Sequence, residues 1–303
     1  MDDLDLPALV ARRFEGVMFD WDGTAVADRT ADASAVRNVV ERLCACGVDV
    51  AIVSGTHVEN VDGQLGARPS GPGRLLLALN RGSELFEVGV DGPRLLARRE
   101  ATSEEDMALT RAAEQIVSRL AARGLETRIV SQRLNRRKID LIPLPEWVDP
   151  PKSQIGRLLA AVEQRLHAAG VDDLAAVAAL ATDVAREVGL ADPRVTSDAK
   201  HMEIGLTDKS DSARAIFAQF WADGIAPELV LIGGDEFGAI GGLPGSDSFM
   251  IVAEAVNAGV CSVGIEHNGV PEGVVYLAGG PRRFLELLGD QVRRRSDIPC
   301  VVV

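Results

Sequence analysis

Apolar residues recur along the chain with two periods, which divide it into predicted strands and helices. Near the start, GVMFD (residues 16–20) and VDVAIVSG (48–55) are almost continuously apolar. Between these two runs, residues 33–46 carry apolar side chains at helical spacing. Continuous apolar runs separated by a helix are typical of parallel strands that are buried on both faces. The first part of the chain therefore predicts a doubly wound α/β sheet.

The pattern changes in the middle of the chain. Strand-like segments here, such as LETRIVS, RKIDLIP and RVTSDAKHMEIGL, mix apolar and charged residues. Helical patterns are predicted near residues 103–123, 152–169 and 172–188. Mixed strands of this kind favour an antiparallel sheet with helices on one side. We therefore assign residues 84–203 to an inserted α+β domain.

The first pattern resumes in the last third of the chain. A helix is predicted over residues 209–224, then the apolar strand ELVLIGGDE, a helix over 248–259, and the strands CSVGIE and GVVYLA. Residues 1–83 and 204–303 are thus predicted to form one mostly parallel, Rossmann-like core domain, interrupted by the inserted domain.

Composition excludes several classes of partner. The 303 residues carry a net charge of −13, which disfavours non-specific binding of nucleic acid or an anionic membrane. No apolar run reaches the roughly 18 residues of a membrane span, and the acidic start MDDLDLPALVARRFEG does not resemble a signal peptide. We expect a soluble cytoplasmic protein with a small-molecule partner. Its four scattered cysteines (44, 46, 261 and 300) are expected to be reduced thiols.

Chemically active side chains follow several of the predicted strands. Asp20 and Asp22 come after VMF, Ser54 after VAIV, Lys209 after IGLTD, and Asp235 after LVLIGG. Each alone has an ordinary explanation, such as a turn or a solvated loop. In an open parallel sheet, however, the carboxyl ends of the strands meet at one crevice, where ligands bind. We therefore expect these side chains to share one site.

The order of these segments resembles the haloacid dehalogenase superfamily of phosphotransferases. FDWDGT is similar to its DxDGT motif, AIVSG to its second motif, Lys209 to its third, and LIGGDE to the start of its acidic fourth motif. An inserted domain between the second and third motifs resembles the type IIB cap. NRGSELF and HMEIGLTDKSDSARAI add to the likeness with that subgroup, which includes trehalose-6-phosphate phosphatase, sucrose-phosphatase and phosphomannomutase.

The resemblance implies a role for each core residue. Asp20 is implied as the nucleophile that forms an aspartyl-phosphate, and Asp22 as the group that protonates the leaving oxygen and later activates water. Asp20, the backbone carbonyl of Asp22, and Asp235 are implied as ligands of Mg²⁺. Ser54 and Lys209 are implied to hold the phosphoryl group. Backbone groups of three further residues are expected to line its cradle: Gly23, Thr24 and Gly55.

The fourth motif departs from the family pattern. A second aspartate is usual about four residues after the first, but Ala239 stands there, within the segment GAIGGLPG that precedes SDSFM. Asp247 is our candidate for the displaced acid, either as a direct ligand of Mg²⁺ or as a group that orients the metal's water or Lys209, with Glu236 as the second choice. The alternative interpretation is that Asp247 only caps the predicted helix over 248–259.

The inserted domain contains a basic segment, SQRLNRRKIDLIP, in an otherwise acidic protein. Arg133, Arg137 and Lys138 are candidates for binding the part of a substrate that lies beyond its phosphate. Alternatively, alternate members of the four cations Arg133, Arg136, Arg137 and Lys138, at least half of them, lie on a solvated strand face.

The sequence therefore predicts a Mg²⁺-dependent phosphomonoester hydrolase that acts on a sugar phosphate or a similar small phosphorylated metabolite. Two alternatives remain open at this point. One is a sugar phosphomutase that resembles phosphomannomutase, and the other is a phosphate-binding module with weakened catalysis. The sequence leaves the oligomeric state undetermined.

Overall fold

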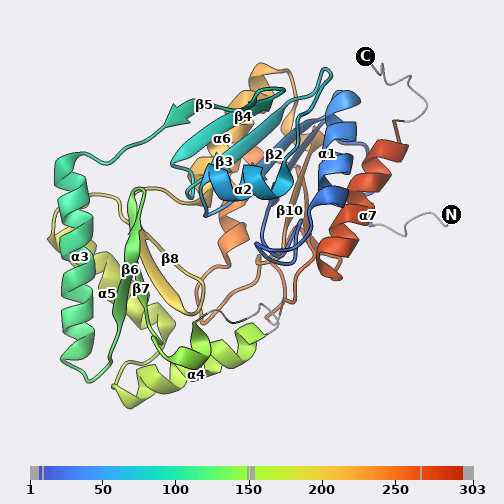
Figure 1. Ribbon diagram of the computed structural model, residues 1–303. Helices are drawn as coiled ribbons and strands as arrows, with labels where there is room; N and C mark the ends of the chain where they lie inside the picture. Colours follow the sequence, from blue (N-terminus) through green and yellow to red (C-terminus); the bar gives the residue numbers. More distant parts are fainter. Residues whose placement is uncertain (1–6, 9, 149, 151–153, 267, 296–303) are drawn as a thin grey trace. The chain divides into compact units, whose positions relative to one another are not determined.

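The computed structural model describes residues 7–8, 10–148, 150, 154–266 and 268–295. The chain divides into two compact units, which Figure 1 shows coloured along the sequence. The core unit comprises residues 1–98, 209–237 and 247–303, and the second unit comprises residues 99–208 and 238–246. The chain therefore enters the second unit twice.

An eight-stranded sheet forms the centre of the core unit, in the order β12-β11-β10-β1-β2-β3-β4-β5. The six strands from β12 to β3 are parallel, and β4 and β5 are added antiparallel at one edge. The strands are β1 (Gly16–Asp20), β2 (Asp49–Val53), β3 (Leu75–Leu79), β4 (Glu84–Gly89), β5 (Gly92–Arg98), β10 (Val230–Gly234), β11 (Gly259–Ser262) and β12 (Val274–Tyr276). This sheet confirms the predicted Rossmann-like fold.

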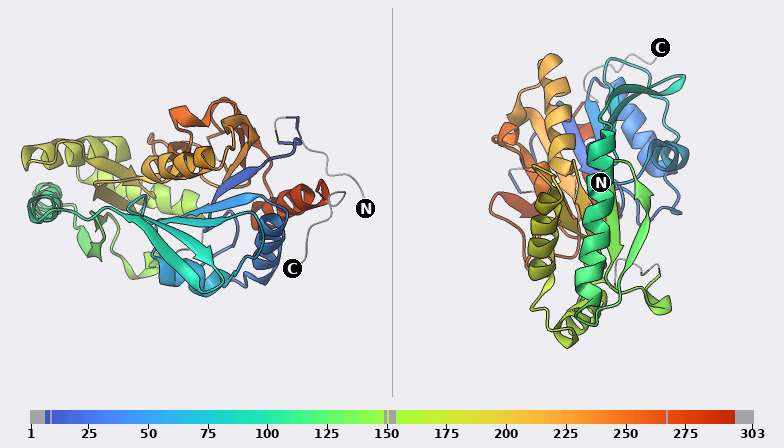
Figure 2. Two further views of the ribbon diagram at one scale, coloured as in Figure 1. Left: turned by 90° about the horizontal axis from the view of Figure 1, so that it is seen from above. Right: turned by 90° about the vertical axis from the view of Figure 1, so that its left-hand side faces the viewer.

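Helices cover both faces of this sheet, as the edge-on view in Figure 2 shows. Helices α1 (Ser34–Ala45), α2 (Val58–Leu65) and α7 (Gly280–Arg293) pack on the face that carries Val17 and Phe19. Helix α6 (Lys209–Ala222) packs on the opposite face, with Met18. Because side chains alternate along a strand, burial on both faces requires the continuous apolar runs seen in the sequence.

The predicted boundaries of the inserted domain are corrected by the structure. Residues 84–98 form β4 and β5, which pair with β3 and extend the core sheet. These two strands lie at an edge, and Leu95 is 44% exposed, so they lack the continuous apolar character of the central strands. At the other end, the second unit runs on to Asp208 and includes all of β9, so the predicted end at 203 falls inside a strand.

The second unit contains a four-stranded antiparallel sheet in the order β6-β7-β9-β8. Its strands are β6 (Arg128–Arg133), β7 (Arg136–Asp140), β8 (Arg194–Ser197) and β9 (His201–Gly205). Helices α3 (Ser103–Ala121), α4 (Ile155–Ala168) and α5 (Leu174–Glu187) share one hydrophobic cluster with Ile139, Met202 and Ile204 of this sheet. The prediction of an antiparallel sheet with helices is confirmed.

The predicted helix over residues 248–259 is wrong. Two short 3-10 helices, Ser246–Met250 and Ala253–Ala255, occupy this region instead. The N–H of Asp247 donates to the carbonyl of Glu236, and Val252 has an extended backbone. The β-branched pair Ile251 and Val252 also disfavours a continuous helix.

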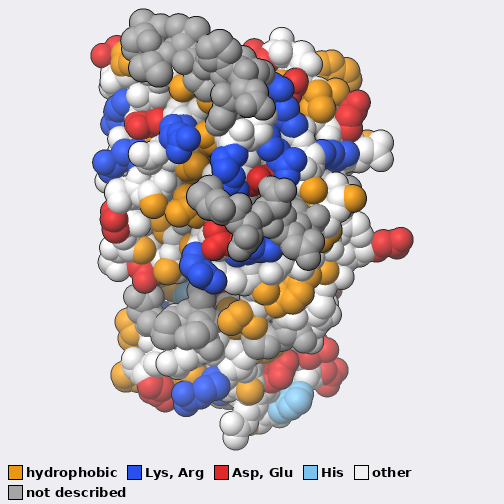
Figure 3. Space-filling view, turned by 90° about the vertical axis from the view of Figure 1, so that its right-hand side faces the viewer, with side chains coloured by type: hydrophobic (Ala, Val, Ile, Leu, Met, Phe, Trp, Pro, Cys, Tyr) orange, Lys and Arg blue, Asp and Glu red, His pale blue; other side chains and the backbone are white. Residues whose placement is uncertain are grey.

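Helix α7 is an element that the sequence analysis did not predict. Arginines at its two ends pair with its own acidic residues, such as Arg283 with Glu286 and Arg294 with Asp290. Figure 3 shows the side of the molecule on which α7 lies, where basic side chains gather with acidic ones among them. Arginines in and just after α7 thus share two acidic partners, Glu286 and Asp290.

Two further expectations concern the chain as a whole. Among the described residues, no helix is both long and apolar enough to cross a membrane. Cys44 and Cys261 are free, buried thiols, whose pKa burial raises to about 12. Cys46 is disulfide-bonded, so the expectation of a reduced thiol is wrong there, and Cys300 lies outside the described residues.

Candidate functional site

Three neighbouring strands end at the same edge of the core sheet. Asp20 closes β1 and lies beside Val53, the last residue of β2, so that Ser54 follows next to it. Phe19 pairs with Gly233 of β10, which places Asp235 just beyond the adjacent strand end. The expected convergence of these strand ends is therefore present in the structure.

The turn after β1 is closed by its own backbone. Gly23 has φ +89°, a left-handed conformation that favours glycine, and its N–H donates to the carbonyl of Val26 at 2.6 Å. Trp21 is buried between the two aspartates of the motif, and its indole N–H donates to Gln64. This turn is thus closed by local backbone hydrogen bonds and held by one side-chain contact with Gln64, which is distant in sequence.

Lys209, the first residue of α6, joins two of the predicted carboxylates. Its ammonium donates to Asp20 Oδ1 at 2.7 Å and to Asp247 Oδ1 at 2.6 Å, and the lysine is only 5% exposed. Burial alone would lower the pKa of this ammonium, but the two carboxylates raise it above its ordinary value. Lys209 therefore stays charged between them.

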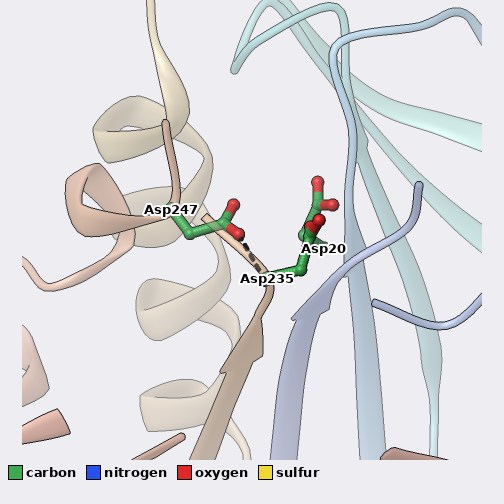
Figure 4. Close-up of side chains that lie close together, drawn as sticks. All are labelled: Asp20, Asp235 and Asp247. Atoms are coloured by element: carbon green, nitrogen blue, oxygen red, sulfur yellow. Dashed lines mark hydrogen bonds between the residues drawn. The ribbon is translucent and has the colours of Figure 1, made fainter. Parts of the chain in front are cut away.

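Asp247 is fully buried and is held by several donors. Figure 4 shows it near Asp20 and Asp235, with its hydrogen bond to Asp235 drawn. Its Oδ2 accepts the N–H of Asp235 at 2.8 Å and the N–H of Glu236 at 2.9 Å, while Oδ1 accepts Lys209. The space is tight, because a Cβ atom at Gly234 would lie 2.5 Å from Asp247 Oδ2. The alternative in which Asp247 caps an α-helix is wrong.

Three carboxylates gather at this point: Asp20, Asp235 and Asp247. Each offers one oxygen, and these oxygens lie within 4.8 Å of one another. This limit is slightly wider than the distance between opposite oxygen ligands of one Mg²⁺, which is about 4.2 Å, twice the metal–oxygen distance of about 2.1 Å, so the cluster is close to the size of one coordination shell. Three negative charges next to the single ammonium of Lys209 also leave an excess that a divalent cation would balance. The residues present therefore fit a Mg²⁺ site.

The other predicted core residues surround this cluster. Thr24 is buried, and its hydroxyl donates to Asp235 Oδ1 at 3.1 Å, a side-chain contact that the sequence analysis did not foresee. Ser54 is buried, and its hydroxyl accepts the N–H of Thr56 at 3.3 Å. Gly55 follows Ser54 and is half-buried. Asp22 lies past the strand end, with its Oδ2 4.0 Å from the Nε of Arg29.

The residues between Asp235 and Asp247 leave the core unit. We call residues 235–247 the acid loop; its central part, 238–246, belongs to the second unit. Ile240 and Leu243 pack against the hydrophobic cluster of that unit, and a Cβ atom at Gly241 would lie 2.9 Å from Leu174 of α5. The loop thus carries a core carboxylate at each end and an apolar anchor at its tip.

The basic segment of the second unit is largely paired within that unit. Arg137 is 2% exposed, and its guanidinium donates to Asp106 and Thr110 of α3. Lys138, on the other face of β7, forms ion pairs with Asp198 and Glu203, both at 3.1 Å. These contacts give Arg137 and Lys138 a structural role within the second unit. Arg133, at the end of β6, is half-buried.

Comparisons with known proteins agree with the fold. No protein-family model and no curated protein matches the chain in sequence. A solved structure of IMP-bound Plasmodium falciparum IMP-nucleotidase aligns with 93% of this chain and 68% of its own length, at TM-score 0.54 and 10% identity. A structure of Aspergillus fumigatus trehalose-6-phosphate phosphatase aligns with 93% of each chain, at TM-score 0.52 and 15% identity. The chain thus shares its fold with these two phosphatases. At these identities the likeness establishes the architecture, and the chemistry has to be argued from the residues.

Proposed function

We propose that this protein is a Mg²⁺-dependent phosphomonoester hydrolase that acts on a sugar phosphate or a similar small phosphorylated metabolite. The observation that carries the proposal is the buried contact of Lys209 with Asp20 and Asp247, beside Asp235. A carboxylate that attacks a phosphate ester approaches an anion, so the site needs positive charge around the phosphorus. A buried lysine and a cluster that fits Mg²⁺ meet that requirement.

In the proposed reaction, Asp20 attacks the phosphorus atom and forms an aspartyl-phosphate as the bond to the leaving oxygen breaks. Asp22 donates a proton to that oxygen, and then accepts a proton from the water that hydrolyses the aspartyl-phosphate. When bound, Mg²⁺ would neutralise charge on the phosphoryl oxygens. Asp20, Asp235 and the backbone carbonyl of Asp22 would hold it.

The remaining residues are proposed to bind the phosphoryl group and to orient the other side chains of the site. Lys209 keeps the Asp20 carboxylate in place and would contact a phosphoryl oxygen once substrate is bound. The Ser54 hydroxyl and the backbone N–H groups of Thr24 and Gly55 would donate to the other phosphoryl oxygens. The N–H of Gly23, also predicted for this cradle, already donates to the carbonyl of Val26 and instead closes the turn. Asp247 already accepts from three donors, so its proposed role is to hold Lys209 and the backbone of Asp235 and Glu236.

The second unit is proposed to act as a cap that excludes water while the aspartyl-phosphate exists. Two observations support that role. In the sequence, residues 99–208 of this unit are inserted between two segments of the core unit, and the unit has its own hydrophobic cluster. Arg133 is the remaining basic candidate for a contact with the leaving group.

The test is a screen for phosphate release in the presence of Mg²⁺. The panel would contain sugar phosphates, including trehalose 6-phosphate, together with IMP and other nucleotides. We expect turnover of at least one sugar phosphate that stops when EDTA is added. Release that persists in EDTA, or no release from any compound by the folded protein, would overturn the proposal.

A further inference from the structure

Three consecutive backbone N–H groups at the start of the acid loop donate to carboxylates. The N–H groups of Asp235 and Glu236 share Asp247 Oδ2. The third, from Phe237, donates to Glu266 Oε1 at 2.8 Å. The Phe237 ring is buried in the core, so its backbone has little freedom to find another partner. Asp247 and Glu266 therefore fix the segment that carries Asp235.

Glu266 is itself held in place by the segment that follows β11. The hydroxyl of Ser262, the fully buried last residue of that strand, donates to the same Oε1 at 2.6 Å. The N–H of Val263 donates to the carbonyl of Gly234 at 2.9 Å. Gly264 lies so close to the carbonyl of Asp235 that a Cβ atom there would overlap it. Residues 262–266 thus lie directly against the backbone of residues 234–237.

We propose that Glu266 is a positioning residue for the metal site, acting through the backbone of Phe237 on the placement of Asp235. This inference rests on the proposed function, because it assigns Asp235 to a metal. Glu266 touches neither substrate nor metal in this scheme. Without its carboxylate, the buried N–H of Phe237 loses its acceptor, and the loop shifts to regain one. Such a shift moves the Asp235 carboxylate away from Asp20.

Three substitutions at Glu266 separate the effect of side-chain length from the effect of its charge. Glu266→Gln keeps the length and an oxygen that can accept both Phe237 and Ser262, but removes the charge. Glu266→Asp keeps the charge but is one methylene shorter, and Glu266→Ala removes both. Glu272→Gln, at an exposed position in the same region, is the matched control. Binding of Mg²⁺ to the full chain is measured by titration calorimetry, with the melting temperature in EDTA as a measure of folding.

We expect Glu266→Asp and Glu266→Ala to weaken Mg²⁺ binding by about 10-fold, the usual loss when a group that orients a metal ligand is removed. Glu266→Gln and Glu272→Gln should bind Mg²⁺ as the wild type does. Weak binding by Glu266→Gln with normal binding by Glu266→Asp would show that charge matters, and would overturn the positioning role. A lower melting temperature in EDTA with unchanged Mg²⁺ affinity in every variant would overturn it as well. Absence of Mg²⁺ binding by the wild type would instead remove the proposed metal site, and the inference with it.

Discussion

The carboxylates of the candidate site are held by two segments that are built in opposite ways. The turn after β1 carries Asp20 and Asp22 and closes on itself within residues 20–26. The acid loop carries Asp235 and Asp247, but its middle part lies in the second unit, and its ends are held by Lys209 and Glu266. The backbone of the turn is closed by local hydrogen bonds, although distant residues contact its side chains. The acid loop depends in addition on Lys209 and Glu266, which are distant in sequence.

This difference separates the two kinds of chemistry in the proposed mechanism. The local turn holds the groups proposed to attack phosphorus and to transfer protons, which need a fixed geometry. The acid loop holds groups proposed to bind and orient the metal, and its chain passes through both units. Substitutions in the turn should therefore change the rate of the chemical steps, whereas substitutions in the loop should change the requirement for Mg²⁺.

The largest effect is expected at Asp20. Asp20→Asn removes the proposed nucleophile, because an amide neither attacks phosphorus nor binds Mg²⁺ comparably. We expect phosphate release to fall by at least about four orders of magnitude, as for other enzymes that lose their nucleophile. Acid quenching of the variant during turnover should trap no phosphorylated protein. Normal turnover by Asp20→Asn would refute the mechanism.

The next effect is expected at Asp22. Asp22→Asn should lower kcat by roughly two to four orders of magnitude, because it removes the general acid and base. The Mg²⁺ concentration at half-maximal activity should stay the same, because the proposed ligand at this position is a backbone carbonyl. If Asp22→Asn raised only the Mg²⁺ requirement and left kcat unchanged, Asp22 would serve in metal binding, as the acid loop does, and the proposed difference between the two segments would be refuted.

Asp247 tests the acid loop itself. An asparagine has only one acceptor oxygen, so Asp247→Asn would direct an amide NH₂ group toward either Lys209 or the N–H groups of Asp235 and Glu236. We expect the Mg²⁺ concentration needed for half-maximal activity to rise by about 10 to 100-fold. Phosphate release measured across a Mg²⁺ titration reports this shift.

Glu236→Gln is the control for Asp247→Asn, since Glu236 is the neighbouring acid and lies outside the cluster of three carboxylates. Its Mg²⁺ requirement should not change. If Glu236→Gln were impaired and Asp247→Asn were not, Glu236 would be the second acid of the motif.

The same contrast explains what could be predicted from the sequence. Asp20, Ser54 and Asp235 each follow an apolar strand, and the rule that parallel strand ends meet at one edge brings them together without further information. The place of Asp247 could be proposed only as a displaced acid. The contacts of Glu266 were not predicted, because they depend on how the segment after β11 lies against the acid loop.

Where the prediction was wrong, tertiary contacts overrode the local pattern. Residues 84–98 have the mixed character of a separate antiparallel sheet, but an edge of the core sheet accepts such strands equally well. The residues after Asp247 have helical spacing, but the backbone of Asp247 is used to close the acid loop. The basic residues Arg137 and Lys138 form ion pairs with acidic partners within the second unit.

The smallest effect is expected at the tip of the acid loop, where two adjacent glycines form a matched pair. Gly241 and Gly242 both have positive φ, +55° and +78°, so alanine is strained at either position. Only Gly241 is crowded, because a Cβ atom there would lie 2.9 Å from Leu174 and 3.2 Å from Leu159, whereas at Gly242 the nearest atom is 3.8 Å away.

Gly241→Ala should therefore push the tip away from α4 and α5, and this displacement reaches Asp235 and Asp247 through a few residues of chain. We expect the Mg²⁺ requirement of Gly241→Ala to rise less than that of Asp247→Asn, by up to about 10-fold, with a smaller rise in Gly242→Ala. Equal Mg²⁺ requirements in both variants would mean that the anchor in the second unit does not position the metal-binding acids.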